Sequence, residues 1–372
     1  MQFAPTDDQT MLMQGIRKLT QGVLRQTAAQ RDTAGSLDAQ TLARLRSLGV
    51  FGLLADPDHG GLGVDATTWI LAVQELAVAD AGLALAVAEH TLAAGLLAHG
   101  EPSTPDLTTM GQGHVLICLD VRDAAADLAA GCPALQAYLS QGVWSVSGAT
   151  PWLALAQVAS VAVVAAESPQ GRALYAVDLR SASVLRSAKP SQLGLRSAAG
   201  ASLTLDTARA RQLTQTADVA ISTTHGWLSL AVAAVAIGVG RAAAKAAGKY
   251  ADERHQFGAP ISRLQPVQWH IANNALDLDA ADLLVVRAAT LIGANSADKP
   301  LSVRALTAIH QAKVAAAEAA VRISDRAVQV HGGYGYTRDF PVERAYRDAA
   351  LLQILHGTPS ALKVLTARSL AA

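Results

Sequence analysis

The hydrophobic pattern of this chain changes twice along its length, and this succession constrains the fold more than any other feature. Over roughly the first 110 residues, apolar side chains recur at helical spacing, as in Leu42–Leu48 and Trp69–Leu76. From about Gly111, short runs of β-branched residues are broken by glycine and polar residues. Long alanine-rich helical segments return after about Asp218. The pattern predicts a mainly α protein with a central β-domain, divided as 1–110, 111–217 and 218–372.

The expected elements can be placed by residue. The predicted strands are Val143–Ser147, Val158–Val164, Ala173–Val177 and Ala201–Leu205, and the predicted later helices are Thr224–Glu253, Val267–Ile292, Val303–Val330 and Ser360–Leu370. The segment Asp56–Gly63 is rich in glycine and proline and is expected to be a loop. Gly238 and Gly240 look like part of a dinucleotide fingerprint, but the alanine-rich run before them continues the helix. We therefore expect these two glycines to allow close helix packing.

Composition excludes several classes of function. Lys and Arg total 30 and Asp and Glu total 30, so no net charge favours nucleic acid or an anionic membrane. Cys118 and Cys132 lack zinc-site spacing with any His pair, which argues for a reducing compartment. The N-terminus has acidic residues where a signal peptide has basic ones, and the apolar run Trp227–Gly240 is too short to span a bilayer. We expect a cytoplasmic protein with a small-molecule substrate and no membrane span.

A candidate phosphate-binding group follows the first long C-terminal helix. Arg254 precedes Phe257 and Gly258, and Gln265 opens the next helical segment. A guanidinium can bind a phosphate through two parallel hydrogen bonds, beside an aromatic wall and an amide. The alternative is a cation at a helix C-terminus followed by a turn.

A second glycine-rich group ends a later helix. Gly332, Gly333 and Gly335 lie within four residues of one another, flanked by Gln329 and two tyrosines. Glycine lets the backbone approach a ligand closely, although a helix C-cap also favours it. The following charged residues at helical spacing, Glu343, Arg344, Arg347 and Asp348, are interpreted as an ion-paired packing network.

These segments, together with Ile354–Thr358, resemble the signature of the flavin-dependent acyl-CoA dehydrogenases. The resemblance implies their fold: an N-terminal helical domain, a middle β-sandwich or barrel and a C-terminal four-helix bundle. It also implies FAD as cofactor. On this resemblance the cofactor-binding residues are Arg254, Phe257 and Gln265 at the pyrophosphate and adenosine, Gln329, Gly332 and Gly333 at the adenine end, and Thr358.

The sequence departs from the family where the catalytic base is expected. The family has Glu-Gly-Thr, whereas this chain has His356 before Gly357 and Thr358. Imidazole titrates near neutrality and could abstract a proton. Alternatively, Thr358 caps a last helix that begins at Pro359, and His356 is only a loop residue. Leu228 occupies the position where some members carry the carboxylate instead, so no substitute carboxylate is expected.

The β-domain departs from the family as well. The loop expected against the flavin ring is replaced by Ile117–Ala125, and its companion segment keeps Trp152 but has Ala154 in place of a hydroxyl residue. In the resembling tetramers each FAD lies between two subunits, and this chain keeps the half that reaches into a neighbour.

The sequence therefore favours a non-catalytic partner subunit of a heteromeric α2β2 acyl-CoA dehydrogenase. A homologous subunit would bind the acyl-CoA, and electron-transfer flavoprotein would accept electrons from the complex. The open alternatives are a self-sufficient dehydrogenase with His356 as base, a flavin monooxygenase of the same fold and, last, a structural protein without FAD.

Overall fold

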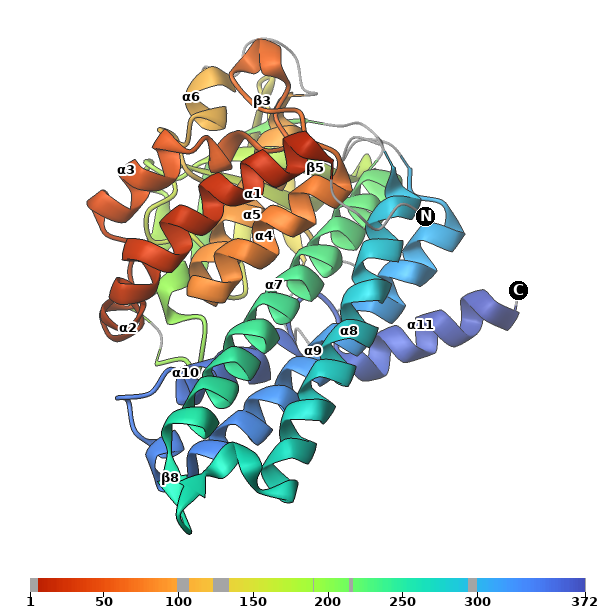
Figure 1. The fold of residues 1–372 in the computed structure, drawn as a ribbon. Helices are drawn as coiled ribbons and strands as arrows, with labels where there is room; N and C mark the ends of the chain where they lie inside the picture. Colours follow the sequence, from red (N-terminus) through yellow and green to blue (C-terminus); the bar gives the residue numbers. More distant parts are fainter. Residues whose placement is uncertain are drawn as a thin grey trace.

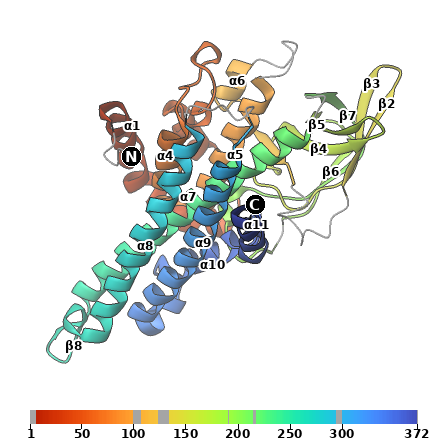
Figure 2. The same cartoon turned by 90° about the vertical axis from the view of Figure 1, so that its right-hand side faces the viewer.

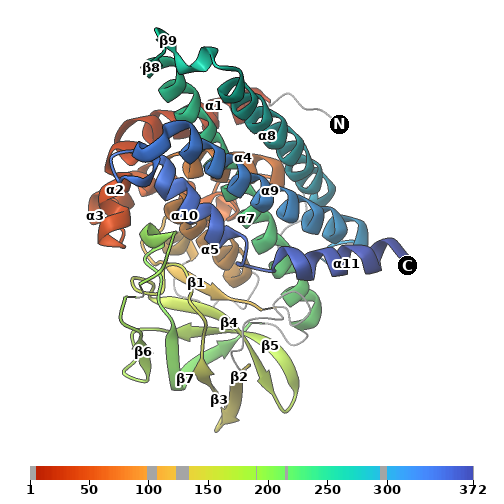
Figure 3. The same ribbon diagram turned by 90° about the horizontal axis from the view of Figure 1, so that it is seen from below.

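The computed structural model describes residues 6–98, 107–122, 134–189, 191–213, 217–293 and 300–371. The helices pack together on one side of the molecule and the β-domain lies on the other, as Figures 1 and 3 show. The succession of helices, sheet and helices predicted from the sequence is confirmed. Cys132 and the last residues of the Ile117–Ala125 segment lie outside the described ranges.

The N-terminal region is helical. Its α-helices are α1 (Asp7–Leu19), α2 (Arg25–Ala34), α3 (Ala39–Ser47), α4 (Ala66–Ala79), α5 (Ala81–Ala98) and α6 (Leu107–Gly111). A π-helical turn, η1 (Thr20–Leu24), joins α1 to α2, and two 3₁₀ turns, η2 (Val50–Gly52) and η3 (Pro57–His59), lie between α3 and α4. The Asp65 side chain caps α4 by accepting a hydrogen bond from the Thr68 backbone N–H. The predicted loop at Asp56–Gly63 is confirmed apart from the short η3 turn.

The β-domain contains the seven-stranded sheet β1 (Ile117–Asp120), β2 (Leu135–Ser140), β3 (Val143–Ala149), β4 (Val161–Ser168), β5 (Gly171–Asp178), β6 (Val184–Arg186) and β7 (Leu203–Gln212). Pairing runs from β4 through β2, β3, β7 and β5 and returns to β4, so the sheet closes on itself as a barrel. β1 pairs with β4 in parallel, and β6 pairs with β7. A short 3₁₀ turn, η4 (Arg196–Ala198), precedes β7.

The C-terminal region contains α7 (Ala217–Glu253), α8 (Gln265–Ile292), α9 (Val303–His331), α10 (Val342–Leu352) and α11 (Pro359–Ala371). Between α7 and α8 lie the two-stranded hairpin β8 (His255–Gln256) and β9 (Ala259–Pro260) and the turn η5 (Ile261–Arg263). A 3₁₀ turn, η6 (Gly332–Tyr336), follows α9. Figure 2 shows the β8–β9 hairpin at the opposite end of the molecule from the barrel.

Helix α7 forms the centre of the packing. A Cβ on Gly238 would lie 2.4 Å from the Cβ of Ala77 on α4, so the predicted role of Gly238 in close helix packing is confirmed. Trp227 meets Trp69 of α4 edge to face, with ring centroids 5.4 Å apart. The apolar run at Trp227–Gly240 belongs to a longer helical segment, Val219–Glu253, which by length and composition alone could cross a membrane. However, 83% of its most apolar window is buried inside the protein.

Candidate functional site

The predicted phosphate-binding residues lie together at the hairpin end of the bundle. Arg254 follows the last residue of α7, Phe257 lies in the tip of the hairpin, and Gln265 begins α8. All three side chains are exposed, and Phe257 is 91% exposed with a left-handed backbone, φ +55°. The Arg254 guanidinium lies 5.9 Å from the ring centroid of Tyr334 in η6. The exposed Phe257 ring and the Arg254 guanidinium are not covered by other parts of this chain. Both groups therefore suit contact with a ligand or with a neighbouring subunit.

A half-buried cluster of aromatic rings lies at this end of the molecule. Tyr250 of α7 stacks on His331 at 4.2 Å between ring centroids, and Phe340 packs its edge against both rings. The His331 Nδ1–H donates to the Ala327 carbonyl at 2.7 Å, and burial lowers the pKa of this imidazole. The cluster holds η6 against the end of α7, which positions Arg254 beside the glycine-rich turn.

The glycines of η6 divide into two kinds. Added Cβ atoms on Gly332 and Gly333 would meet nothing within 4 Å, and Gly332 has φ +58°. A Cβ on Gly335, in contrast, would lie 2.6 Å from the Val328 carbonyl oxygen, so this glycine is needed for packing. Gln329 is exposed on the last turn of α9, beside the open glycines. Open backbone, an exposed guanidinium and an exposed amide fit the pyrophosphate and adenosine of a dinucleotide cofactor.

His356 and Thr358 lie far from this group. Lys313 of α9 contacts the segment that carries His356, and Gly332 lies 19 residues further along the chain. At about 1.5 Å per helical residue, this places the two groups roughly 28 Å apart along α9. Figure 3 shows the hairpin at one end and the α10–α11 connection nearer the barrel. One chain therefore does not bring all of the predicted residues into one site.

The structure places a carboxylate beside His356. Its Nε2 atom lies 3.0 Å from Oε1 of Glu89 in α5, and the two side chains are only 18% and 3% exposed. This carboxylate lies outside the Leu228 position, where none was expected. Sequence reasoning missed Glu89 because it lies 267 residues away in an apolar helix. A charged residue inside such a helix was the available signal, since buried carboxylates are rare unless paired.

The neighbour of Glu89 has a different role. His90 is fully buried, receives a hydrogen bond from the Ile117 backbone N–H at 3.2 Å and lies 3.0 Å from the Met110 carbonyl oxygen. Burial lowers its pKa to about 4, so this imidazole is neutral and structural. It attaches α5 to the start of β1, and thereby fixes the turn of helix from which Glu89 projects.

The backbone around His356 is held at several points. His356 has φ +48°, which is strained for a residue with a Cβ. The Ser229 hydroxyl of α7 donates to its carbonyl at 3.0 Å. The buried Lys313 ammonium donates to the carbonyls of Gln353, at 2.8 Å, and Gly357. The segment is thus fixed from two helices of the bundle.

Other residues around this segment agree with the sequence. Thr358 accepts from the Ala361 backbone N–H at 3.3 Å and α11 begins at Pro359, so the predicted cap is confirmed. Its contact with a cofactor stays a prediction. The His225 ring meets that of His356 edge to face at 6.2 Å between centroids. Leu228 is fully buried, so the alternative base position is apolar.

The part of the barrel predicted to face a flavin is partly described. Ala154 is fully buried and offers no hydroxyl. The Trp152 ring lies against Gly200, where a Cβ would come within 2.2 Å of the indole nitrogen. That buried nitrogen has no hydrogen-bond partner within the described ranges. A buried donor without an acceptor is costly, so a ligand that brings an acceptor fits this position. Cys118 is buried in β1, and burial raises the pKa of its thiol, which makes it unreactive.

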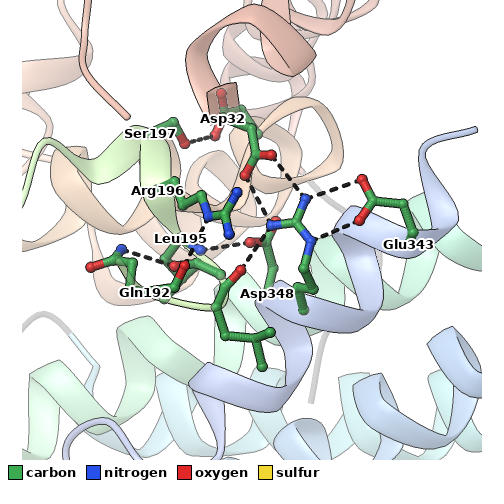
Figure 4. A network of polar contacts seen from close by, with 11 residues as sticks. Asp32, Gln192, Leu195, Arg196, Ser197, Glu343 and Asp348 are labelled. Carbon is green, nitrogen blue, oxygen red and sulfur yellow. Dashed lines mark hydrogen bonds and ion pairs between the residues drawn. The ribbon is translucent and has the colours of Figure 1, made fainter. Parts of the chain in front are cut away.

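The predicted charged network at α10 is confirmed as a packing device. Arg347 bonds both oxygens of Asp32, at 2.8 and 3.1 Å, and both of Glu343, at 2.7 and 3.1 Å. Asp348 accepts from the Leu195 backbone N–H at 2.6 Å. Figure 4 shows Asp32 and Glu343 converging on one guanidinium, with Asp348 and Leu195 beside them. Burial raises the pKa of Asp348 to about 7, against the opposing effects of this hydrogen bond and of Arg344.

Comparison with known proteins agrees with this geometry. Two family models match: "Acyl-CoA dehydrogenase, N-terminal domain" over residues 6–104 and "Acyl-CoA dehydrogenase, C-terminal domain" over residues 218–371. The probable acyl-CoA dehydrogenase YngJ of Bacillus subtilis (strain 168) is 29% identical, with 100% of both chains covered. The human mitochondrial short-chain specific acyl-CoA dehydrogenase is 28% identical over 96% of this chain and 88% of its own. Butyryl-CoA dehydrogenase from Megasphaera elsdenii superposes with a TM-score of 0.89 at 25% identity, covering 100% of each chain.

Proposed function

The chain belongs to the acyl-CoA dehydrogenase family, an FAD-dependent family of oxidoreductases that act on CH–CH groups, and from this premise we propose that it is a self-sufficient dehydrogenase with His356 as its base. The supporting observation is the buried pair of His356 and Glu89, at the place where the family carries its carboxylate. Burying two ionisable groups is costly, and an apolar pair of equal volume is often as stable. A subunit that catalyses nothing at this position would gain little stability from such a pair.

The reaction proposed is α,β-desaturation of a CoA thioester. The α C–H bond breaks and its proton passes to the imidazole of His356, while the electron pair of that bond forms the new double bond. FAD bound at this site would supply the acceptor for the hydride that leaves the β carbon. The product is the α,β-unsaturated thioester, and His356 ends the step as an imidazolium ion. Butyryl-CoA is the first substrate to test, because two of the relatives are named for short-chain or butyryl substrates.

The exposed group at the hairpin end would serve a neighbouring subunit. Arg254, Phe257, Gly332 and Gly333 face outward and lie roughly 28 Å from His356 along α9. In the proposed assembly each copy gives these residues to the FAD pyrophosphate and adenosine of the next copy. Identical chains can then complete one another's sites.

A second candidate is a non-catalytic partner subunit in an unlike pair. It is favoured by the buried Ala154 and Leu228, which offer neither the expected hydroxyl nor a carboxylate at the alternative base position. In that case a homologous subunit would supply the base and the flavin-ring contacts. Electron-transfer flavoprotein would accept the electrons of the complex.

Purifying the chain alone separates the two candidates. A self-sufficient enzyme should be yellow, contain about one FAD per chain and be bleached anaerobically by an acyl-CoA. A colourless chain that acquires FAD only when it is co-expressed with a homologue would refute self-sufficiency and favour the partner subunit. The His356→Gln variant is the matched control, since it should bind FAD and resist bleaching.

A further inference from the structure

We propose that Glu89 is the positioning residue for the base: it fixes the His356 imidazole as the Nε2–H tautomer and leaves Nδ1 as the atom that accepts the proton. This inference rests on the proposed function of His356. It adds a residue from the N-terminal helices to a site otherwise built from the C-terminal region. No sequence motif identifies Glu89, and only its 3.0 Å contact with His356 does so.

The burial of Glu89 is the first argument. Its side chain is 3% exposed on α5. Within the described part of the chain, its carboxylate makes one hydrogen bond, to His356. A carboxylate in such surroundings is tolerated when it is paired, and removing the partner is strongly destabilising. The two residues therefore form a unit.

The chemistry of the contact assigns the tautomer. An ionised carboxylate can only accept hydrogen bonds, so we take Glu89 as the acceptor and Nε2 of His356 as the atom that carries the proton of this contact. In a neutral imidazole the other nitrogen then has the free lone pair. A proton abstracted from a substrate must bind at Nδ1, and the imidazolium formed is compensated by the Glu89 carboxylate.

The backbone also holds the His356 side chain in place. The left-handed φ of +48° sets the direction in which the His356 side chain leaves the chain. Ser229 holds its carbonyl, and Lys313 holds the carbonyl of Gly357. The backbone is thus held by Ser229 and Lys313, and the ring is held at Nε2 by Glu89. Local backbone strain retained in this way is typical of functional positions.

The test compares Glu89→Gln and Glu89→Leu with the wild-type protein and with His356→Gln. A Gln side chain can still accept from Nε2–H but carries no charge, whereas Leu removes both acceptor and charge. Two readouts are needed. The first is the ¹⁵N spectrum of histidine-labelled protein, in which the His356 signal is the one lost in His356→Gln. The second is the rate of flavin reduction by butyryl-CoA, separated into its limiting rate and its half-saturating concentration.

We expect the wild-type protein and Glu89→Gln to show the Nε2–H tautomer and Glu89→Leu to show a mixture. The limiting rate should fall at least about tenfold in Glu89→Gln and by up to about 10⁴ in Glu89→Leu, with little change in the half-saturating concentration. Glu75→Gln, which removes a carboxylate from the neighbouring α4, should leave both readouts unchanged. If Glu89→Leu fails to fold, the nearly isosteric Gln variant still decides the point through its rate.

This inference would be overturned if Glu89→Leu kept the Nε2–H tautomer and both Glu89 variants reduced the flavin at the wild-type rate. Combined with a large loss in His356→Gln, that result would leave the proposed function intact. A normal rate in His356→Gln would instead refute the proposed function itself. The two failures are therefore distinguishable in one set of proteins.

Discussion

Arg347 is expected to be a major stabilising residue outside the site, and Arg347→Met tests this. Its guanidinium makes four hydrogen bonds to the carboxylates of Asp32 and Glu343 and one, at 2.8 Å, to the Leu193 carbonyl. Asp32 belongs to α2 and Glu343 to α10, so the residue joins the N-terminal helices, the segment before β7 and the C-terminal region. Methionine keeps much of the apolar stem but leaves both carboxylates without this partner.

The size of the effect follows from the burial of the group. Removing one partner of a buried ion pair costs about 3–5 kcal/mol. The three side chains retain 11–19% exposure, so water partly replaces the lost contacts and we expect about 3 kcal/mol. At roughly 2.1 cal/mol/K per residue, unfolding a chain of this length has an entropy of about 0.8 kcal/mol/K, which predicts a fall in Tm of about 4 °C.

Denaturant unfolding and calorimetry of the purified protein measure this loss. Arg347→Lys should give an intermediate value, because an ammonium keeps the charge but cannot bond two carboxylates as a planar fork. Arg368→Met is the matched control: this arginine is exposed on α11 and should change stability by less than about 0.5 kcal/mol. A loss in Arg347→Met no larger than in the control would refute the reasoning.

Two further predictions concern pH and the cofactor. Burial raises the pKa of Asp348 to about 7, above its ordinary value, so its contribution to stability is greatest in acid and is lost as pH rises towards 7. Compared with Asp348→Asn, the wild-type protein should lose stability between about pH 4 and 7, by at most about 1.4 kcal/mol per pH unit, and parallel pH curves would contradict this. Arg254→Ala should weaken FAD binding about 10- to 100-fold in a titration of apoprotein, with a smaller loss for Lys. Unchanged affinity would leave Arg254 as a helix-terminal cation only.

Local sequence signals predicted much of the fold. The α9 helix was expected at Val303–Val330 and is found at Val303–His331, because its alanine-rich periodic pattern is long and its Ser302 cap is local. Strands β1, β2 and β6 were not predicted. β1 and β6 are only four and three residues long, and their pairing with β4 and β7 joins segments distant in the sequence. Short strands stabilised by distant partners leave little pattern in their own residues.

The site was predictable to the extent that it is local. The glycine-rich turn and the cap at Thr358 are contiguous motifs, and the structure gives them the expected conformations. The pairing of Glu89 with His356 was not predictable, because no rule of spacing connects residues 267 positions apart. The structure shows a buried imidazole–carboxylate pair at a residue that the sequence alone left open as a loop residue or a base.

Anaerobic single-turnover reduction of the isolated protein tests the central claim most directly. The purified chain, without any homologue, is mixed with butyryl-CoA and a series of longer acyl-CoA thioesters while flavin absorbance is followed. We predict about one FAD per chain and bleaching by at least one thioester. In His356→Gln the rate should fall by roughly the 10² to 10⁴ typical of losing a positioned general base. An isolated chain without FAD, or reduction in His356→Gln within a few fold of the wild-type rate, would contradict the account.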